Sequence, residues 1–248
     1  MTDVPNVQIH ILDSITKLND AHLGHVIVAA SHGAEYAAYL AAKGGARAVI
    51  LNDAGVGKDN AGISGLPYMD EFGIPTATFG YQTARIGDGA DMMARGIISH
   101  VNNAAANLGC AAGWACQDCA DLMRNAPLIS ANPQTQTERR ILLRETAGVP
   151  PVWGIDSASL VVPDDTNHIL ICGSHGEALG GKPETALRYD AIAAVFNDAG
   201  IGIDDAGISR LPALDGRNIP AATVSAASAR IGNAQSIYLS LIHISEPT

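Results

Sequence analysis

Two histidines, His32 and His175, each stand in the middle of a Ser-His-Gly triplet that follows an apolar run. An imidazole titrates near neutral pH, so at the end of a strand it can serve as an acid, a base or a metal ligand. Amides near the glycine can bind an anion. The alternative is that the serine caps a helix and the histidine bonds a nearby carbonyl. We expect His32 and His175 to be catalytic and their neighbours to bind substrate: Ser31, Gly33, Ser174 and Gly176.

An Asn-Asp-Ala-Gly motif follows the next apolar run in each half of the chain. The aspartate can bind a metal, orient a histidine or accept ligand hydroxyls, and the asparagine supplies both a donor and an acceptor. The alternative is a structural turn whose side chains bond their own loop amides. A turn explains the glycines better than it explains the recurrence of both polar residues. We therefore expect Asp53 and Asp198 to be catalytic, and Asn52 and Asn197 to bind substrate.

A third recurring motif, Ala-Arg-Ile-Gly, contains Arg85 in the first half and Arg230 in the second. A guanidinium at a strand end suits a carboxylate or phosphate held by two parallel hydrogen bonds. We expect both arginines to bind substrate. The equally open alternative is an ion pair with Asp53 or Asp59 that ties two loops together.

Candidate metal ligands are few. Asp13 and Asp156 each precede a serine at the end of an expected strand, and we assign them as ligands of a divalent metal. The cofactor is otherwise unknown. Cys116 and Cys119 form a Cys-x-x-Cys pair, but one such pair without a second is weak evidence for zinc and favours ordinary helix packing.

Residues 176–183 nearly match the phosphate-binding loop of nucleoside triphosphate hydrolases. The last position of the motif must supply a hydroxyl for magnesium, and Pro183 cannot do so. Nucleoside triphosphate hydrolysis is therefore disfavoured.

These motifs belong to a long internal repeat. Residues 52–67 and 197–212 are identical at 12 of 16 positions. The offset between the copies is 143 residues at Ser-His-Gly and 145 residues from Asn-Asp-Ala-Gly onward. A repeat of this period predicts two similar domains rather than a solenoid.

Apolar runs rich in β-branched residues predict the strands that position the motifs. They are Val7–Leu12, Val26–Ala30, Ala48–Leu51 and Ile74–Phe79 in the first copy, and His168–Cys172, Ala193–Phe196 and Ala221–Ser225 in the second. Continuous apolar strands are typical of parallel sheets buried on both faces. Ligands of such sheets bind at the carboxyl ends of the strands, where the motifs fall.

Four segments have helical patterns. Glu35–Lys43 and Ala61–Phe72 each end at glycine, as helices often do. Apolar residues at three- and four-residue steps predict a long helix from Met93 to Leu108. Glu138–Thr146, between two proline-containing stretches, is expected to be a short helix in the linker.

The fold class expected is α/β: a tandem duplication of a Rossmann-like three-layer α/β/α domain with mostly parallel sheets, its second copy truncated. We place the first repeat at residues 1–130, a linker with its short helix at 131–151, and the incomplete second repeat at 152–238.

Residues 239–248, LSLIHISEPT, resemble the translation of a sequencing adapter and are expected to be a non-native tail. The alternative is a genuine C-terminal strand.

Composition limits the classes of partner. Hydrophobic residues make up 47% of the 248, which is typical of a globular protein. A net charge of −10 without a basic cluster disfavours nucleic acid. No apolar run is long enough to span a membrane, and no signal peptide precedes the first strand, so we expect a cytoplasmic protein without a membrane partner. Homo-oligomerisation is left open.

Three functions fit these observations. The first is a hydrolase or lyase acting on a small anionic metabolite, with histidine as acid or base and arginine as anion anchor. The second is a non-catalytic ligand-binding or sensor module with two pseudo-symmetric lobes. The third is a structural pseudo-dimer whose motifs serve only as turns and caps.

Overall fold

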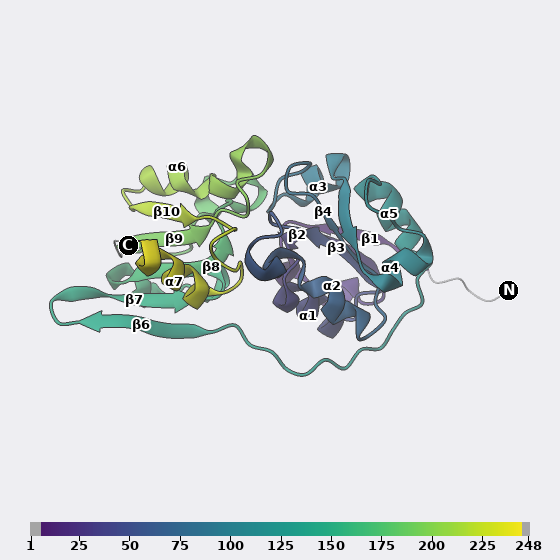
Figure 1. The fold of residues 1–248 in the computed structure, drawn as a ribbon, viewed down its shortest axis with the longest axis horizontal. Coiled ribbons are helices and arrows are strands. Elements are labelled where there is room, and N and C mark those ends of the chain that lie inside the picture. Colours follow the sequence, from purple (N-terminus) through teal and green to yellow (C-terminus); the bar gives the residue numbers. More distant parts are fainter. Residues whose placement is uncertain (1–5, 245–248) are drawn as a thin grey trace.

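The computed structural model describes residues 6–244 and contains two five-stranded, mostly parallel sheets with helices, one sheet in each half of the chain (Figure 1). The expectation of a tandem α/β fold with two similar sheet units is confirmed. An extended segment runs along one side of the molecule and connects the halves (Figure 1).

The first sheet has the order β1-β2-β3-β4-β5. Its first four strands are parallel and β5 is antiparallel to β4. The strands are β1 (Ile9–Leu12), β2 (Val26–His32), β3 (Ala48–Asn52), β4 (Thr76–Phe79) and β5 (Ile98–Val101). Neighbouring side chains of β2 point to opposite faces, so Val28 and Ala29 belong to two different core clusters. The sheet is therefore buried on both faces.

Helices cover both faces of the first sheet. Its helices are α1 (Glu35–Lys43), α2 (Gly65–Asp70), α3 (Gly89–Arg95), α4 (Asn103–Leu108) and α5 (Cys116–Met123). The crossovers that carry α1 and α2 lie on one face, as right-handed connections between sequential strands require. The chain then turns back, and α3 and α5 pack on the other face. The strands follow one another in chain order across the sheet. The more specific prediction that each domain is Rossmann-like is therefore not confirmed.

The second sheet has the order β10-β9-β8-β7-β6, with β6 antiparallel to β7 and the rest parallel. The elements of this half are β6 (Arg140–Thr146), β7 (Val149–Ile155), β8 (Ile169–His175), β9 (Ala193–Asn197), β10 (Ala221–Val224), α6 (Arg210–Asp215) and α7 (Ala234–Ile244). Strands β7–β10 correspond to β1–β4, and α7 packs on β8 as α3 packs on β2. All seven strands expected from the sequence are present.

The long helix expected from Met93 to Leu108 is wrong. The segment contains α3, then β5, then α4. Gly96 ends α3 in an extended conformation, and Asn102 caps α4 through a bond from the Ala105 amide. The β-branched stretch between them pairs with β4, because pairing satisfies backbone groups that β4 would otherwise leave open. The apolar residues of this segment kept a four-residue spacing through the strand, so the sequence pattern looked like that of one continuous helix.

The linker helix expected over Glu138–Thr146 is also wrong, because residues 140–146 form β6. The Arg140 side chain lies over the Trp153 ring and donates to Asp165, which fixes the strand against β7. Gly148 supplies the positive φ of the hairpin turn.

Two further segments differ in detail. The expected helix at 61–72 begins as a 3₁₀ segment, Lys58–Ile63, before α2 starts. Residues 239–244, expected to be non-native, continue α7, and the rest of that tail, 245–248, lies outside the described residues. Within the described part of the chain, none of the helices has the length and apolar character needed to cross a membrane.

Candidate functional site

The two halves meet with the carboxyl ends of their strands facing each other. The Ile203 amide donates to the Tyr81 carbonyl at 3.0 Å, and the Lys58 amide donates to the Ala226 carbonyl at 2.8 Å. These bonds join residues that occupy equivalent positions in the two copies. The backbones at Gly55 and its counterpart Gly200 also lie in contact. The halves are therefore related by an approximate two-fold axis that passes close to these glycines.

The Asn-Asp-Ala-Gly loops build this junction. Asn52 Oδ1 accepts from the Ala54 amide at 2.6 Å, and Asp53 Oδ1 accepts from Gly55 at 3.1 Å and from Tyr81 at 3.0 Å. The second copy repeats these bonds through Asn197 and Asp198. The loops carry runs of residues at positive φ, with Ala54, Val56, Asp59 and Asn60 in the first copy.

Such backbone strain persists only where the surroundings hold it in place, and here the Asn and Asp side chains do so. Asp53 and Asp198 point into their own loops and line neither of the two neighbouring cavities described below. The same is true of Asn52 and Asn197. This geometry matches the structural-turn alternative for the motif.

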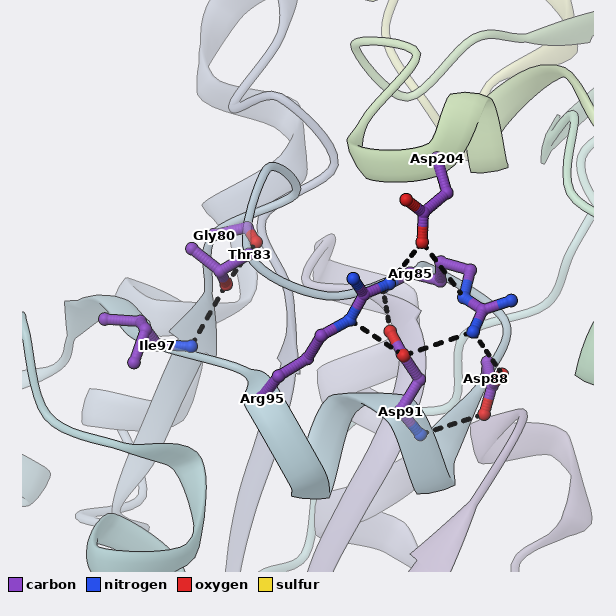
Figure 2. A network of polar contacts seen from close by, with 8 residues as sticks. All are labelled: Gly80, Thr83, Arg85, Asp88, Asp91, Arg95, Ile97 and Asp204. Carbon is purple, nitrogen blue, oxygen red and sulfur yellow. Dashed lines mark hydrogen bonds and ion pairs between the residues drawn. The ribbon is translucent and has the colours of Figure 1, made fainter.

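The arginines of the third motif form ion pairs across the junction. Arg230 Nε lies 2.7 Å from Asp59, and Arg85 Nε lies 3.7 Å from Asp204, the counterpart of Asp59. Figure 2 shows Asp204 of the second half reaching between Arg85 and Arg95, while Asp91 contacts both arginines from below. Arg230 thus forms the ion pair with Asp59 that the alternative interpretation named, but Asp59 belongs to the opposite half.

The two candidate metal ligands also hold the fold together. Asp13 accepts from the Gly89 amide at 3.2 Å and pairs with Lys17. Asp156 accepts from the Ala234 amide at 3.0 Å and pairs with Arg139. Each aspartate thus anchors the start of α3 or α7. Among residues 6–244, no group of three or more His, Cys, Asp or Glu side chains is arranged to hold a metal ion.

A cavity of about 430 Å³ lies between the halves, at the carboxyl ends of β1, β2, β7 and β8. Its wall combines equivalent residues of both copies, so hydroxyl groups and imidazoles occur in pairs. These pairs are Ser14 and Ser157, Thr16 and Ser159, Ser31 and Ser174, and His32 and His175. Of the expected site residues, the structure brings four together here: both histidines and the serines that precede them.

Ser31 and Gly33 are engaged with their own half. Ser31 Oγ accepts from the Ile15 amide at 2.9 Å, and Ser174 does the same for Ala158. The Gly33 amide donates to the Asn52 carbonyl, and Gly176 repeats the bond in the second copy. These glycine amides are therefore not available to an anion.

Both histidines are held in the neutral state. Burial lowers the pKa of His32 to about 4. Burial, the Arg210 guanidinium and His32 itself hold the pKa of His175 well below its usual range. Each Nδ1 accepts a backbone amide, from Ala34 at 3.4 Å and from Glu177 at 3.3 Å. The ring proton consequently lies on Nε2, and each imidazole can donate a hydrogen bond from that atom.

Glu138 is a cavity residue that the sequence reasoning missed. It precedes β6 and has no counterpart in the repeat. Burial and the Asp156 carboxylate raise the pKa of Glu138 to about 7, although hydrogen bonds from Ser157 and Ser159 oppose the shift. A carboxyl group with this pKa exchanges protons readily at neutral pH. It was missed because the linker was expected to be helical and no motif surrounds this glutamate.

Arg210 is a second residue missed by the sequence reasoning. It is 3% exposed and its guanidinium donates to the carbonyl oxygens of His175, Thr185 and Ala186. The first copy has Gly65 at this position. Aligning the two copies therefore shows an arginine in place of a glycine, and this difference could have identified the residue. The guanidinium also lies over the Phe196 ring, and among the described residues it forms no ion pair with a carboxylate, so its positive charge stands at the cavity wall without an anionic partner.

The free cysteines do not contribute to the cavity. Cys116 and Cys119 pack inside the first half among apolar residues, as the helix-packing interpretation expects. Comparison of the chain with family models, curated proteins and solved structures finds no match.

Proposed function

We propose that the protein is an acid–base enzyme of the hydrolase or lyase type that acts on a small anionic metabolite in the cavity between its halves. The observation that supports this most is the convergence of Glu138, His32 and His175 on one cavity of about 430 Å³. Cavities of this size hold small metabolites. Perturbed titratable groups in a cleft are frequent at catalytic sites.

Glu138 is the general acid or base of this proposal. Its pKa of about 7 lies where a carboxyl group can both accept and return a proton during one turnover. His32 and His175 act as neutral hydrogen-bond donors that polarise a substrate carbonyl through Nε2. This role differs from the proton transfer first expected of them, and a neutral imidazole with a low pKa is suited to it.

The anion anchor of this proposal is Arg188 together with Arg210. Both line the cavity, and within residues 6–244 neither forms an ion pair with a carboxylate. They replace Arg85 and Arg230 in the role expected from the sequence, because those two arginines are committed to carboxylates of the opposite half.

The test is a turnover screen of small carboxylic acids, esters and amides, followed by the Glu138→Gln variant on any substrate found. The variant keeps the shape of the side chain but cannot transfer a proton, so we expect turnover to fall roughly 10²–10⁴-fold with little loss of binding. Glu145→Gln, in the exposed end of β6, is the matched control and should turn over normally. Normal turnover by Glu138→Gln would reject the proposal.

One observation favours a non-catalytic binding module as the second candidate. Both histidines have their basic Nδ1 atoms occupied by backbone amides, so neither is ready to take a proton. Such a cavity can recognise a ligand without transforming it. Calorimetry alongside the turnover screen separates the two: a ligand bound but never converted supports the binding module.

A further inference from the structure

A second cavity adjoins the one between the halves. This second cavity has a volume of about 420 Å³ and shares His32, Tyr36 and Glu138 with the first. The three shared side chains line both spaces. Tyr36 lies beside Glu138, and burial together with that carboxyl raises the pKa of the Tyr36 hydroxyl. We treat the two adjoining spaces as one cleft, and the proposed acid–base residue lies on the wall that they share.

The second cavity is rich in carboxyl groups. Glu35, Asp59, Glu138 and Asp156 line it, against a single lining arginine, Arg230. Asp59 is neutralised by that arginine and Asp156 by Arg139. Within residues 6–244 the Glu35 carboxylate accepts only the neutral amide of Gln136 and has no cationic partner. This end of the cleft favours a cation.

The first cavity has the opposite character. Arg188 and the buried Arg210 line it, and of the described residues Glu184 is the only carboxylate there besides the shared Glu138. The Arg210 charge is the most deeply buried of these, and the low dielectric around it strengthens its attraction for an anion. The paired hydroxyl groups of the wall can donate further hydrogen bonds to the same anion.

We propose that the cleft takes a dipolar substrate, with a carboxylate or similar anion in the first cavity and an ammonium group in the second. Its central atoms then lie at Glu138 and His32. This inference rests on the proposed function, because it assigns a substrate class to the same site. It extends that function by assigning the second cavity a recognition role that the expected anionic metabolite did not require.

The experiment measures binding by calorimetry and needs no turnover. The probes are a matched set of six-carbon compounds: 6-aminohexanoate (dipolar), hexanoate (anion only), hexylamine (cation only) and adipate (two anions). Amino acids from 4-aminobutanoate to 8-aminooctanoate cover the unknown distance between the end groups. We expect the best dipolar probe to bind at least 10-fold more tightly than either six-carbon compound with one charged group, and adipate to bind more weakly than 6-aminohexanoate.

Two variants assign the ends of the cleft. Glu35→Gln should weaken the dipolar probe and hexylamine at least 5-fold and leave hexanoate unchanged. Arg188→Ala should weaken the dipolar probe and hexanoate and leave hexylamine unchanged. Both side chains are exposed, so neither substitution should prevent folding. Glu145→Gln is the control for the loss of one surface carboxylate.

Three results would overturn the dipolar assignment: no binding by any amino acid of the series, adipate binding as tightly as 6-aminohexanoate, or equal effects of Glu35→Gln on hexylamine and hexanoate. The acid–base role of Glu138 would survive each of these, since it is tested separately by Glu138→Gln. Conversely, dipolar probes that bind as described while Glu138→Gln retains full turnover would reject the enzyme and keep the substrate class as a ligand class.

Discussion

The first and second halves of the molecule differ where they enclose the cleft. In the first half, α1 follows the Ser-His-Gly triplet, and the second half has two short 3₁₀ segments and irregular chain in its place. Gly65 packs closely under α1, where a Cβ would touch Ala38. In the second half the missing helix leaves room for Arg210, whose guanidinium bonds the irregular chain instead.

The comparison teaches that repeated and unrepeated residues have different tasks. The repeated Asn, Asp and Arg residues hold strained loops and join the halves across the two-fold axis. The unrepeated Glu138, Arg188 and Arg210 give the cleft its charge and its titratable group. Recurrence in both copies therefore identified residues of the junction between the halves better than it identified residues of the cavity.

The largest effect is expected at the glycines beneath the strained loops. A Cβ on Gly62 would collide with the Asp53 carbonyl oxygen, and one on Gly207 with the equivalent Asp198 oxygen. We expect Gly62→Ala and Gly207→Ala each to lower the free energy of unfolding by about 3 kcal/mol or more in a denaturant titration.

Gly73→Ala is the control for these two variants, because Gly73 has a positive φ but open space around it. It should cost only about 1 kcal/mol. If Gly62→Ala and Gly207→Ala lowered the free energy of unfolding by different amounts, the two loops would not be equivalent.

The next effect concerns Glu177, which replaces the Ala34 of the first half. It is 1% exposed and its Oε2 lacks a hydrogen-bond partner within the described chain. Burial and the carboxylates of Asp88 and Asp91 raise its pKa to about 8, against the opposing guanidinium charges of Arg85 and Arg210.

The folded state therefore favours the protonated Glu177, and this contribution to stability is lost as the pH rises from about 4.5 to about 8. We expect Glu177→Gln to remove a decline of up to about 5 kcal/mol over this range, since each unit of pKa shift is worth about 1.4 kcal/mol, measured as the variant-minus-wild-type difference in unfolding free energy at each pH. A difference that does not change with pH would contradict the buried, protonated carboxyl.

Arg210→Ala is expected to lower the free energy of unfolding by a comparable or smaller amount. The substitution leaves three carbonyl oxygens without their donor and should lower the free energy of unfolding by about 2 kcal/mol. The irregular chain at residues 178–192 should also exchange its amide hydrogens faster. Unchanged exchange there would show that Arg210 does not substitute for the missing helix.

The smallest effect is expected for the ion pair between Arg230 and Asp59, which is exposed on both sides. Arg230→Ala should change the free energy of unfolding by less than about 1 kcal/mol at low salt, and by less still at high salt, because solvent screens such pairs. A loss above about 2 kcal/mol would show that this pair, and not the loop hydrogen bonds, holds the halves together.

The sequence predicted the fold well where the local pattern and the tertiary structure agree. The apolar runs at 26–30 and 48–51 are buried strands, and Glu35–Lys43 is a helix. The prediction failed at β5 and β6, two antiparallel edge strands whose identity depends on pairing with distant segments. Local spacing carries no information about such partners.

The site was predicted in part for the same reason. His32 and His175 reach the cleft because the end of a buried strand fixes their position. Arg85 and Arg230 follow strands too, but their long side chains find carboxylates of the opposite half, which only the packing of the halves reveals. Glu138 depends on the path of the linker and lay outside every motif.

The most direct measurement is a pH titration of the glutamate side chains by carbon-13 NMR, with Glu138→Gln and Glu177→Gln used to assign the two unusual signals. We expect one signal with a midpoint near pH 7 that is absent from Glu138→Gln, separate from the Glu177 signal near pH 8. If the Glu138 signal instead titrates near 4.5 with the exposed glutamates, the cleft does not hold a group ready for proton transfer at neutral pH.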